Sequence, residues 1–239
     1  MKILVLGHNG MLGHMVHKYL STKNCELLTT NLRWPSEKFN NFVLDFDGDF
    51  VVNCIGAIHQ RTDDFKVNVD LPIWLDKLDK KFKIIHPGTD CEIDDDAYGI
   101  SKREATEYLL RKGKNTSIIK TSIIGPELNT QASLLEWFLN VKEQTVNGYS
   151  GCYWNGNTTL QWARICYDMM IDLDKYKKLT ILATECISKY DLLNIMRDVY
   201  NKNIVINKNS DLKINKCLNG TIEVPDIKKQ LIELKDFTN

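Results

Sequence analysis

A glycine-rich loop directly after the first apolar run constrains the fold of this chain more than any other feature. The run Lys2–Leu6 has the length and apolar character of a buried strand, and a helical pattern follows from about Met11 to Leu20. The loop between them reads Gly7-His8-Asn9-Gly10-Met11-Leu12-Gly13. Glycines permit a tight turn and a close approach of the backbone to a pyrophosphate, and the helix N-terminus offers free N–H groups. The order strand, glycine loop, helix therefore predicts a dinucleotide site.

Short apolar runs alternate with helical patterns through the first half, which is typical of βαβ units and a parallel sheet. Strands are expected at Lys2–Leu6, Glu26–Thr30, Phe42–Leu44, Phe50–Cys54, Phe82–His86 and Ser117–Ile124, with helices at Met11–Leu20, Leu71–Leu78 and Tyr98–Leu110. Beyond these, helices are expected at 133–141, 160–171, 189–200 and 226–234, the last opened by Pro225, and strands at 179–183 and 204–206. The pattern predicts an α/β fold with a Rossmann-type doubly wound parallel sheet and a small C-terminal α/β substrate-binding lobe.

We expect an NAD(P)-binding Rossmann domain at 1–125 and a substrate-binding portion at 126–239, with some segments of the latter returning to the main sheet. Lys plus Arg equals Asp plus Glu at 31 each, so no net field draws the chain to nucleic acid or an anionic membrane. No apolar stretch approaches the roughly 20 residues of a bilayer span, and the N-terminal run is too short for a secretory signal. Seven scattered cysteines without a CxxC pair predict reduced thiols in a cytoplasmic protein, with neither disulfides nor a metal.

The residues after the second expected strand favour NADP(H) over NAD(H). An NAD site usually places Asp or Glu there to hold the ribose 2′-hydroxyl. This chain has Thr29, Thr30 and Asn31, with Arg33 just beyond. The missing acid and the nearby guanidinium suit a 2′-phosphate. Arg33 as a solvated surface residue is the alternative, and NAD(H) then remains open.

Tyr98 and Lys102 are four residues apart on an expected helix and so share a face. A phenol, with a reference pKa of about 10, exchanges protons poorly at neutral pH unless a nearby ammonium lowers that pKa. Such a pair beside a nicotinamide could protonate a carbonyl as hydride arrives, although an isolated pair is more often a surface feature. Thr89 lies just past the strand Phe82–His86, where its hydroxyl could reach the same oxygen. These three residues are the predicted catalytic group.

Taken together, the motifs resemble those of the extended short-chain dehydrogenase/reductases, and among them the dTDP-4-dehydrorhamnose reductase family. The matching segments are the GxxGxxG loop at 7–13, Asn53-Cys54-Ile55-Gly56, Asn68-Val69, Thr89-Asp90, Tyr98 with Lys102, and Thr121-Ser122-Ile123-Ile124-Gly125. Leu134–Phe138 and Trp154–Leu160 are similar to a bacterial sugar-nucleotide-binding branch of that group. Gly88 stands where family members often have Ser, and the short acidic segment after Thr89 departs from the family's longer insertion.

The resemblance implies NADPH-dependent reduction of the C4 keto group of a dTDP- or UDP-linked 4-keto-6-deoxy sugar. Tyr98 would donate the proton, Lys102 would lower its pKa and hold the nicotinamide ribose, and Thr89 would bond the carbonyl oxygen. The expected cofactor-binding residues are Gly7, His8, Asn9, Gly10, Met11, Leu12, Asn31, Arg33, Cys54, Ile55, Gly56, Tyr98 and Lys102. Trp137, Trp154 and Asn155, with Thr89, are the candidates for substrate binding, and lid or core packing is the alternative for the first three.

Two other functions stay open at this point. Cys91 follows Thr89 at the spacing seen in bifunctional epimerase–reductases, and a thiol can be one member of the acid–base pair that epimerises C3 and C5. A small buried cysteine is the alternative. The family also includes a non-catalytic, nucleotide-binding regulatory subunit, but the retained Thr89, Tyr98 and Lys102 argue against that role. Relatives are commonly dimers, so a homodimer is one expectation. The nucleotide base, the sugar and the product stereochemistry stay open.

Overall fold

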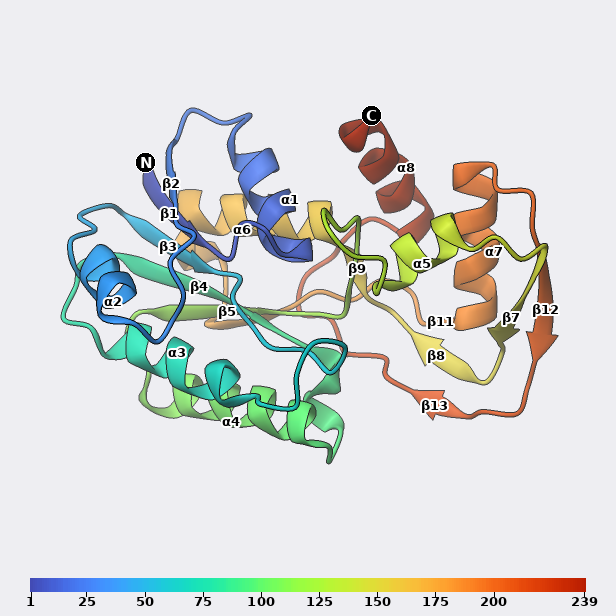
Figure 1. Ribbon diagram of the computed structural model, residues 1–239, viewed down its shortest axis with the longest axis horizontal. Helices are drawn as coiled ribbons and strands as arrows, with labels where there is room; N and C mark the ends of the chain where they lie inside the picture. The colour runs from blue at the N-terminus through green and yellow to red at the C-terminus, as the bar shows by residue number, and fades with distance from the viewer. The chain divides into compact units, whose positions relative to one another are not determined.

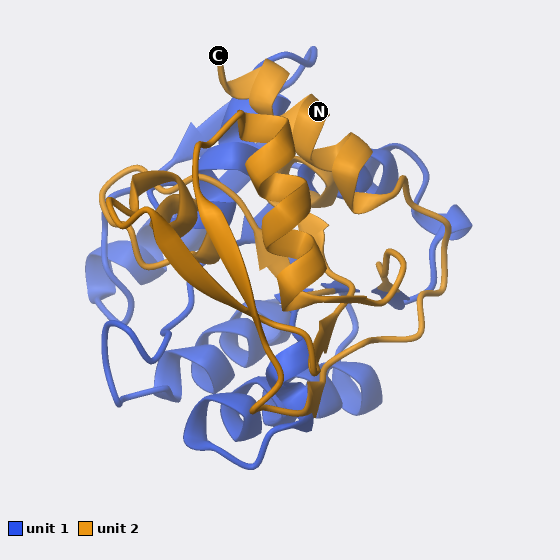
Figure 2. Ribbon diagram, turned by 90° about the vertical axis from the view of Figure 1, so that its right-hand side faces the viewer, with its two compact units in different colours: residues 1–120, 163–180 blue, residues 121–162, 181–239 orange.

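A computed structural model describes residues 1–239, which divide into two compact units. Unit 1 comprises Met1–Lys120 and Ala163–Thr180, and unit 2 comprises Thr121–Trp162 and Ile181–Asn239 (Figure 2). The binding roles predicted for residues 1–125 and 126–239 concern ligands and stay predictions. None of the helices combines the length and apolar character that a membrane span requires.

The centre of unit 1 is a six-stranded sheet with the strand order β10-β5-β4-β3-β1-β2 (Figure 1). Its strands are β1 (Lys2–Leu6), β2 (Glu26–Thr29), β3 (Phe50–Asn53), β4 (Lys83–Gly88), β5 (Thr116–Lys120) and β10 (Leu179–Ile181). All pairings among β1 to β5 are parallel. The strand order reverses between β1 and β3, and in open α/β sheets ligands bind outside the carboxyl ends of the strands at such a reversal.

Helices cover both faces of this sheet, as the predicted α/β fold requires. The helices are α1 (Met11–Leu20), α2 (Glu37–Leu44), α3 (Lys66–Lys77), α4 (Ala97–Lys112) and α6 (Thr159–Ile171), with the short 3-10 helices η1 (Asp90–Ile93) and η2 (Leu173–Lys175). Figure 1 shows α3 and α4 on one face and α1 and α6 on the other. The core between β1, α2, β3, α3 and β4 is made of fully buried aliphatic and aromatic side chains.

The expected strand Phe42–Leu44 is wrong, because these residues end helix α2. The hydroxyl of Ser36 accepts the N–H of Phe39 and so caps the helix. Phe39 and Val43, four residues apart, are both fully buried, and burying each contributes about 1.5–3 kcal/mol. Helical spacing of these two core residues therefore outweighs the short apolar run. Similarly, Ser117–Ile124 is not one strand but two, β5 and β6 (Ile123–Ile124).

Unit 2 is built from short strands and three helices. Its elements are β6, α5 (Leu134–Asn140), β7 (Thr145–Tyr149), β8 (Cys152–Trp154), β9 (Asn157–Thr158), β11 (Ile187–Ser188), α7 (Lys189–Tyr200), β12 (Val205–Asn209), β13 (Ile214–Asn215) and α8 (Ile227–Thr238). They form a three-stranded sheet, β11-β8-β13, and the strand pairs β12-β7 and β6-β9. The helices α5, α7 and α8 confirm the predicted pattern. Asp226, not Pro225, caps α8, because its carboxylate accepts the N–H of Lys229.

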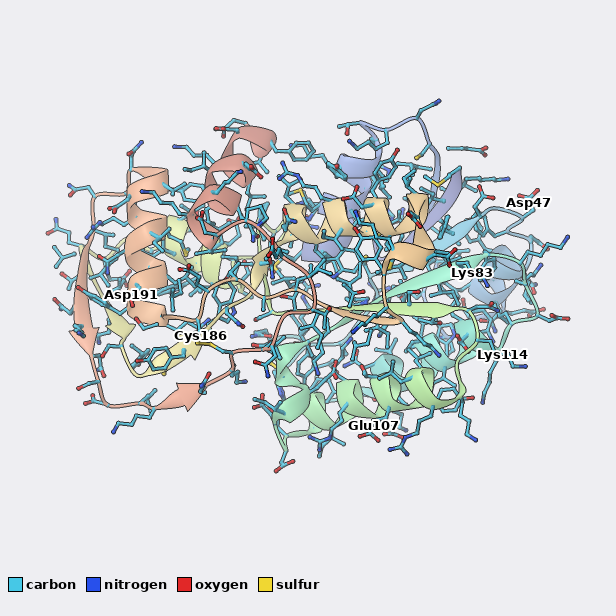
Figure 3. All side chains as sticks on the ribbon, turned by 180° about the vertical axis from the view of Figure 1, so that it is seen from behind. Asp47, Lys83, Glu107, Lys114, Cys186 and Asp191 are labelled. Carbon is cyan, nitrogen blue, oxygen red and sulfur yellow. A yellow bond between two sulfur atoms is a disulfide. The ribbon has the colours of Figure 1, made fainter.

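A disulfide joins Cys186 and Cys217, so the prediction of seven reduced thiols is wrong for these two. Cys186, labelled in Figure 3, lies just before β11, and Cys217 follows β13. Because β11 and β13 both pair with β8, the sheet brings together cysteines 31 residues apart. Their spacing in the sequence carries no such signal. The other five cysteines do not form disulfides.

Replacing both Cys186 and Cys217 by Ser should destabilise the protein by roughly 3–4 kcal/mol, because an open loop of this length gains entropy in the unfolded chain. Urea unfolding of the double variant and of the matched control Cys25→Ser would measure the difference. Thiol titration of the unreduced, denatured wild type should find five thiols. Seven thiols, together with equal stability of the double variant and wild type, would contradict the disulfide.

Candidate active site

The glycine loop is shaped by two close backbone approaches. Gly7 has a φ of +78°, and a Cβ there would lie 2.8 Å from the carbonyl carbon of Cys54. A Cβ on Gly13 would lie 2.1 Å from the carbonyl oxygen of Gly7. By contrast, a Cβ on Gly10 would make only an ordinary contact at 3.4 Å. Sterics therefore require glycine at positions 7 and 13, where the loop packs against the end of β3 and against α1.

The N-terminus of α1 is open to an anion. Gly10 is the N-cap and has no side chain to satisfy the first N–H groups of the helix. The helix dipole adds positive potential at the same point, beside Met11 and Leu12. His8 has a buried Nδ1 without a hydrogen-bond partner, and burial, with the nearby His17, lowers its pKa. The loop thus offers backbone donors and a neutral imidazole, which fit a pyrophosphate.

The segment after β2 lies against this loop. The Asn9 amide donates to the side-chain oxygen of Asn31 at 2.9 Å. No carboxylate stands at the end of β2, where Thr30 uses its hydroxyl to accept the N–H of Leu32. Arg33 is exposed and its guanidinium has no partner within the chain. A free guanidinium without a neighbouring acid fits a ribose 2′-phosphate better than a 2′-hydroxyl.

The segment after β3 is held in place by Asn68 of α3. The Asn68 side chain accepts the N–H of Ala57 at 2.8 Å and donates to its carbonyl oxygen at 3.1 Å. It also donates to the hydroxyl of Ser101 in α4. Cys54, Ile55 and the exposed Gly56 are thereby presented at the end of β3, beside the glycine loop. Burial raises the pKa of the Cys54 thiol to about 12, so this residue is not a nucleophile at neutral pH.

Thr89 directly follows β4 and is the N-cap of η1. Its hydroxyl accepts the N–H of Cys91 at 3.3 Å, and the carboxylate of Glu92 accepts the N–H of Thr89 at 3.0 Å, which completes a capping box. The buried Glu92 carboxylate also accepts the hydroxyl of Thr106 in α4 and pairs with the ammonium of Lys120 at 2.8 Å. One carboxylate therefore ties the turn that carries Thr89 to both α4 and β5.

Tyr98 lies in the first turn of α4, beside this turn. Its pKa is raised well above the ordinary value, first because burial disfavours the phenolate. The Cys91 thiol is the next cause, and the carboxylates of Asp90 and Glu92 add to it. A side-chain hydrogen bond with Thr89 lowers the pKa in part. The phenol is thus protonated at neutral pH, so its proton is available to a substrate oxygen.

Lys102, four residues after Tyr98 on α4, is directed to the end of β4. Its ammonium donates to the carbonyl oxygen of Pro87 at 2.9 Å and is not among the groups that shift the pKa of Tyr98. Lys102 is thus directed to the end of β4, and its predicted effect on the pKa of Tyr98 stays a prediction. Burial lowers the pKa of Lys102 itself to about 8, although Glu92 and Cys54 oppose the shift.

The three substrate candidates of unit 2 have different surroundings. Trp137 on α5 has a relative exposure of 39%, whereas Trp154 at the end of β8 is buried at 2%. Asn155 donates to the carbonyl oxygen of Leu218 and accepts its N–H, both at 2.8 Å. Both ends of the Asn155 amide thus hold the chain next to Cys217. Among the three, Trp137 alone presents an exposed side chain, and their binding of substrate stays a prediction.

Two features of the site are missing from the sequence-based prediction. The first is Glu92, which the pattern Thr89-x-x-Glu92 could have indicated as a capping box. The second is an aromatic cluster in which His59 and Phe65 pack against Tyr98. His59 and Phe65 lie in a polar connection after β3, and nothing in their spacing points to Tyr98.

Comparisons with known proteins establish the fold. No protein-family model matches the chain, and no curated protein is similar to it in sequence. A solved dTDP-4-dehydrorhamnose reductase ortholog from Clostridium acetobutylicum is 19% identical with a TM-score of 0.73, covering 100% of this chain and 99% of that one. A dTDP-4-dehydrorhamnose reductase from Bacillus anthracis, in complex with NADP, is 10% identical with a TM-score of 0.76 and 98% of both chains covered.

A dTDP-glucose 4,6-dehydratase from the same organism, in complex with NAD, is 14% identical with a TM-score of 0.72, covering 99% of this chain and 96% of that one. These likenesses confirm the predicted fold class, a Rossmann-type parallel sheet with flanking helices. In its fold the chain resembles solved dTDP-4-dehydrorhamnose reductases and a solved dTDP-glucose 4,6-dehydratase.

The lowered pKa of Lys102 makes stability depend on pH. Lys102 titrates at about 8 in the folded protein and at its ordinary 10.5 in the unfolded chain, so the unfolded state binds more protons between these values. The free energy of unfolding should therefore rise with pH across this interval, and Lys102→Met should lack the rise. Urea unfolding of both proteins at about pH 7.5, 9 and 10 measures the difference. A difference that stays constant with pH would contradict the assignment.

Proposed function

We propose that this chain is an NADPH-dependent reductase that converts the C4 keto group of a dTDP- or UDP-linked 4-keto-6-deoxy sugar to an alcohol. The observation that carries the proposal is the packing of α4, whose first turn carries Tyr98, on the η1 turn that Thr89 caps directly after β4. The glycine loop and the Cys54–Gly56 segment follow β1 and β3, the next strands of the same sheet. A cofactor cradle and an acid at neighbouring strand ends suit hydride transfer to a carbonyl.

The residues present fit a bound NADPH, which supplies the hydride. The amides at the start of α1, by Met11 and Leu12, would take the pyrophosphate, and Arg33 would take the 2′-phosphate. Lys102 would donate a hydrogen bond to the nicotinamide ribose. Its ammonium has three N–H donors, so it could keep its hydrogen bond to the carbonyl oxygen of Pro87 or give it up. The Bacillus anthracis reductase with NADP supports this choice of cofactor, and the dehydratase with NAD keeps NAD(H) as the alternative.

The chemistry of this chain's own residues is proton donation and orientation. The Thr89 hydroxyl is close enough to the Tyr98 phenol to affect its pKa, so one carbonyl oxygen can contact both. Thr89 orients that oxygen, and Tyr98 donates its proton as the carbon gains hydride, so that the carbonyl becomes an alcohol and Tyr98 a phenolate. The raised pKa keeps the Tyr98 phenol protonated until charge develops on the oxygen, and the developing alkoxide is a stronger base than the phenolate and so takes the proton.

Epimerisation through Cys91 is a second candidate function. The Cys91 thiol is close enough to raise the pKa of Tyr98, and it donates to the carboxylate of Asp90 at 3.8 Å. An acid–base group next to the proton donor could act on a carbon adjacent to the same ketone. The test below separates the two functions, because a plain reductase needs a substrate that a separate epimerase has already converted.

The proposed activity predicts that NADPH is oxidised in the presence of a dTDP- or UDP-4-keto-6-deoxy sugar. Tyr98→Phe should slow this oxidation by roughly 10²- to 10⁴-fold. Nicotinamide absorbance measures the rate, with and without an added 3,5-epimerase. Oxidation only with the epimerase indicates a plain reductase. Oxidation without it, abolished by Cys91→Ser, indicates the bifunctional enzyme. NADPH binding without oxidation of any sugar in the panel would refute the proposal and favour a regulatory nucleotide-binding subunit.

The second prediction concerns the choice of cofactor. Arg33→Ala should weaken NADPH binding by about 10- to 100-fold, because it removes a charge-assisted hydrogen bond to the 2′-phosphate. NADH has no such phosphate, so its affinity should change little. Fluorescence titration of both cofactors against wild type and variant measures this, and Arg61→Ala is a control outside the predicted site. An equal loss of affinity for NADPH and NADH would mean that Arg33 does not bind the 2′-phosphate.

A further inference from the structure

Three aromatic rings pack together at the proton donor. The ring centroids of His59 and Phe65 are 4.9 Å apart, those of His59 and Tyr98 are 5.5 Å apart, and those of Phe65 and Tyr98 are 5.8 Å apart. The interplanar angles lie between 56° and 75°, as is typical of tilted and edge-to-face aromatic packing. Each ring therefore contacts the other two.

Asp96 joins this cluster to the helix that carries Tyr98. Its Oδ2 lies 3.4 Å from Nε2 of His59, and its Oδ1 accepts the N–H of Gly99 at 2.7 Å as the N-cap of α4. One carboxylate thus fixes the first turn of α4 and holds the imidazole next to the ring of Tyr98, two residues further along. The clamp, meaning His59 with Asp96, contacts the ring of Tyr98 through the imidazole.

The exposures of the two flanking rings differ. The Phe65 residue is buried at 7%, whereas the side chain of His59 is 48% exposed. Phe65 therefore packs on the Tyr98 ring from the protein interior, and His59 packs on it from the side that faces solvent. An exposed His–Asp pair contributes little to stability, about 0–1 kcal/mol, so holding the fold together does not account for this arrangement.

We propose that His59, oriented by Asp96, is a positioning residue that fixes the Tyr98 ring for proton donation and covers its solvent side. The proposal rests on the proposed function. The Lys102 ammonium is bound to Pro87, so the Tyr98 ring is restrained by its two aromatic neighbours, the buried Phe65 and the exposed His59. Small displacements of a proton donor are costly, since misplacement by about 1 Å can slow a reaction by roughly 10²-fold.

The kinetic test compares three substitutions of His59 in the full-length protein. His59→Ala removes ring and bond, His59→Gln keeps a polar group that can reach Asp96, and His59→Phe keeps a ring. Because the ring provides the restraint, His59→Ala and His59→Gln should lower kcat by roughly tenfold or more, with KM for sugar and NADPH nearly unchanged. His59→Phe, which keeps a ring but loses the contact with Asp96, should restore part of kcat. Gln60→Ala, its exposed neighbour, is the control and should match wild type.

A second measurement does not depend on activity. Nitration of tyrosines by tetranitromethane, mapped by peptide mass spectrometry, reports how readily each phenol reacts, which increases as the ring becomes exposed and ionises more easily. Nitration of Tyr98 should be several-fold faster in His59→Ala than in wild type, and that of Tyr153, which is 44% exposed, should not change.

The outcomes separate this inference from the proposed function. If none of the keto sugars supports NADPH oxidation by the wild type, the proposed function fails. The nitration experiment by itself still tests whether His59 covers Tyr98. If wild type is active and His59→Ala keeps its kcat, the positioning role is overturned, whatever the nitration shows. A fall in kcat for His59→Ala and His59→Gln, with recovery in His59→Phe, supports it.

Discussion

The arrangement of unit 1 depends on the close approach of two backbone segments, the glycine loop after β1 and the end of β3. At Gly7 there is no room for a Cβ beside Cys54, so the segments meet without side chains between them. They meet where the strand order of the sheet reverses, and the amides at the start of α1 are left free at the same point. The geometry of a phosphate cradle thus follows from sterics at Gly7 and Gly13 together with the absence of a capping side chain at Gly10.

A second set of contacts fixes the reactive side chains next to that cradle. Glu92 holds the Thr89 turn to α4 and β5, and Asp96 caps α4 while orienting His59. Both carboxylates act on backbone N–H groups and on side chains, so each couples local helix geometry to a neighbouring element. The resulting burial keeps Tyr98 a neutral phenol. The same burial lowers the pKa of Lys102, which is destabilising at neutral pH and is typical of a residue retained for binding or catalysis.

Burial also explains why spacing in the sequence is not enough to give the direction in which a pKa is shifted. Spacing places Tyr98 and Lys102 on one face of α4, and both indeed lie on that helix. Spacing does not predict that the Lys102 ammonium donates to the carbonyl oxygen of Pro87. It also does not predict that Cys91, Asp90 and Glu92 lie close to the Tyr98 phenol. Those neighbours come from η1, a turn whose position depends on the Glu92 contacts. The electrostatics of the site are therefore a property of the folded chain.

The sequence alone determined the local features: the glycine loop, the α/β alternation, the helices α1, α4 and α7, and the positions of Thr89 and Tyr98 after β4. Each rests on periodicity or on a backbone requirement acting over a few residues. Tertiary structure alone decided the helical state of Phe42–Leu44, the joining of Cys186 to Cys217, the direction of Lys102, and the packing of His59 on Tyr98. The physical reason is the same for all four. Burial and long-range contacts set their energies, and these arise only when segments far apart in the chain have been brought together.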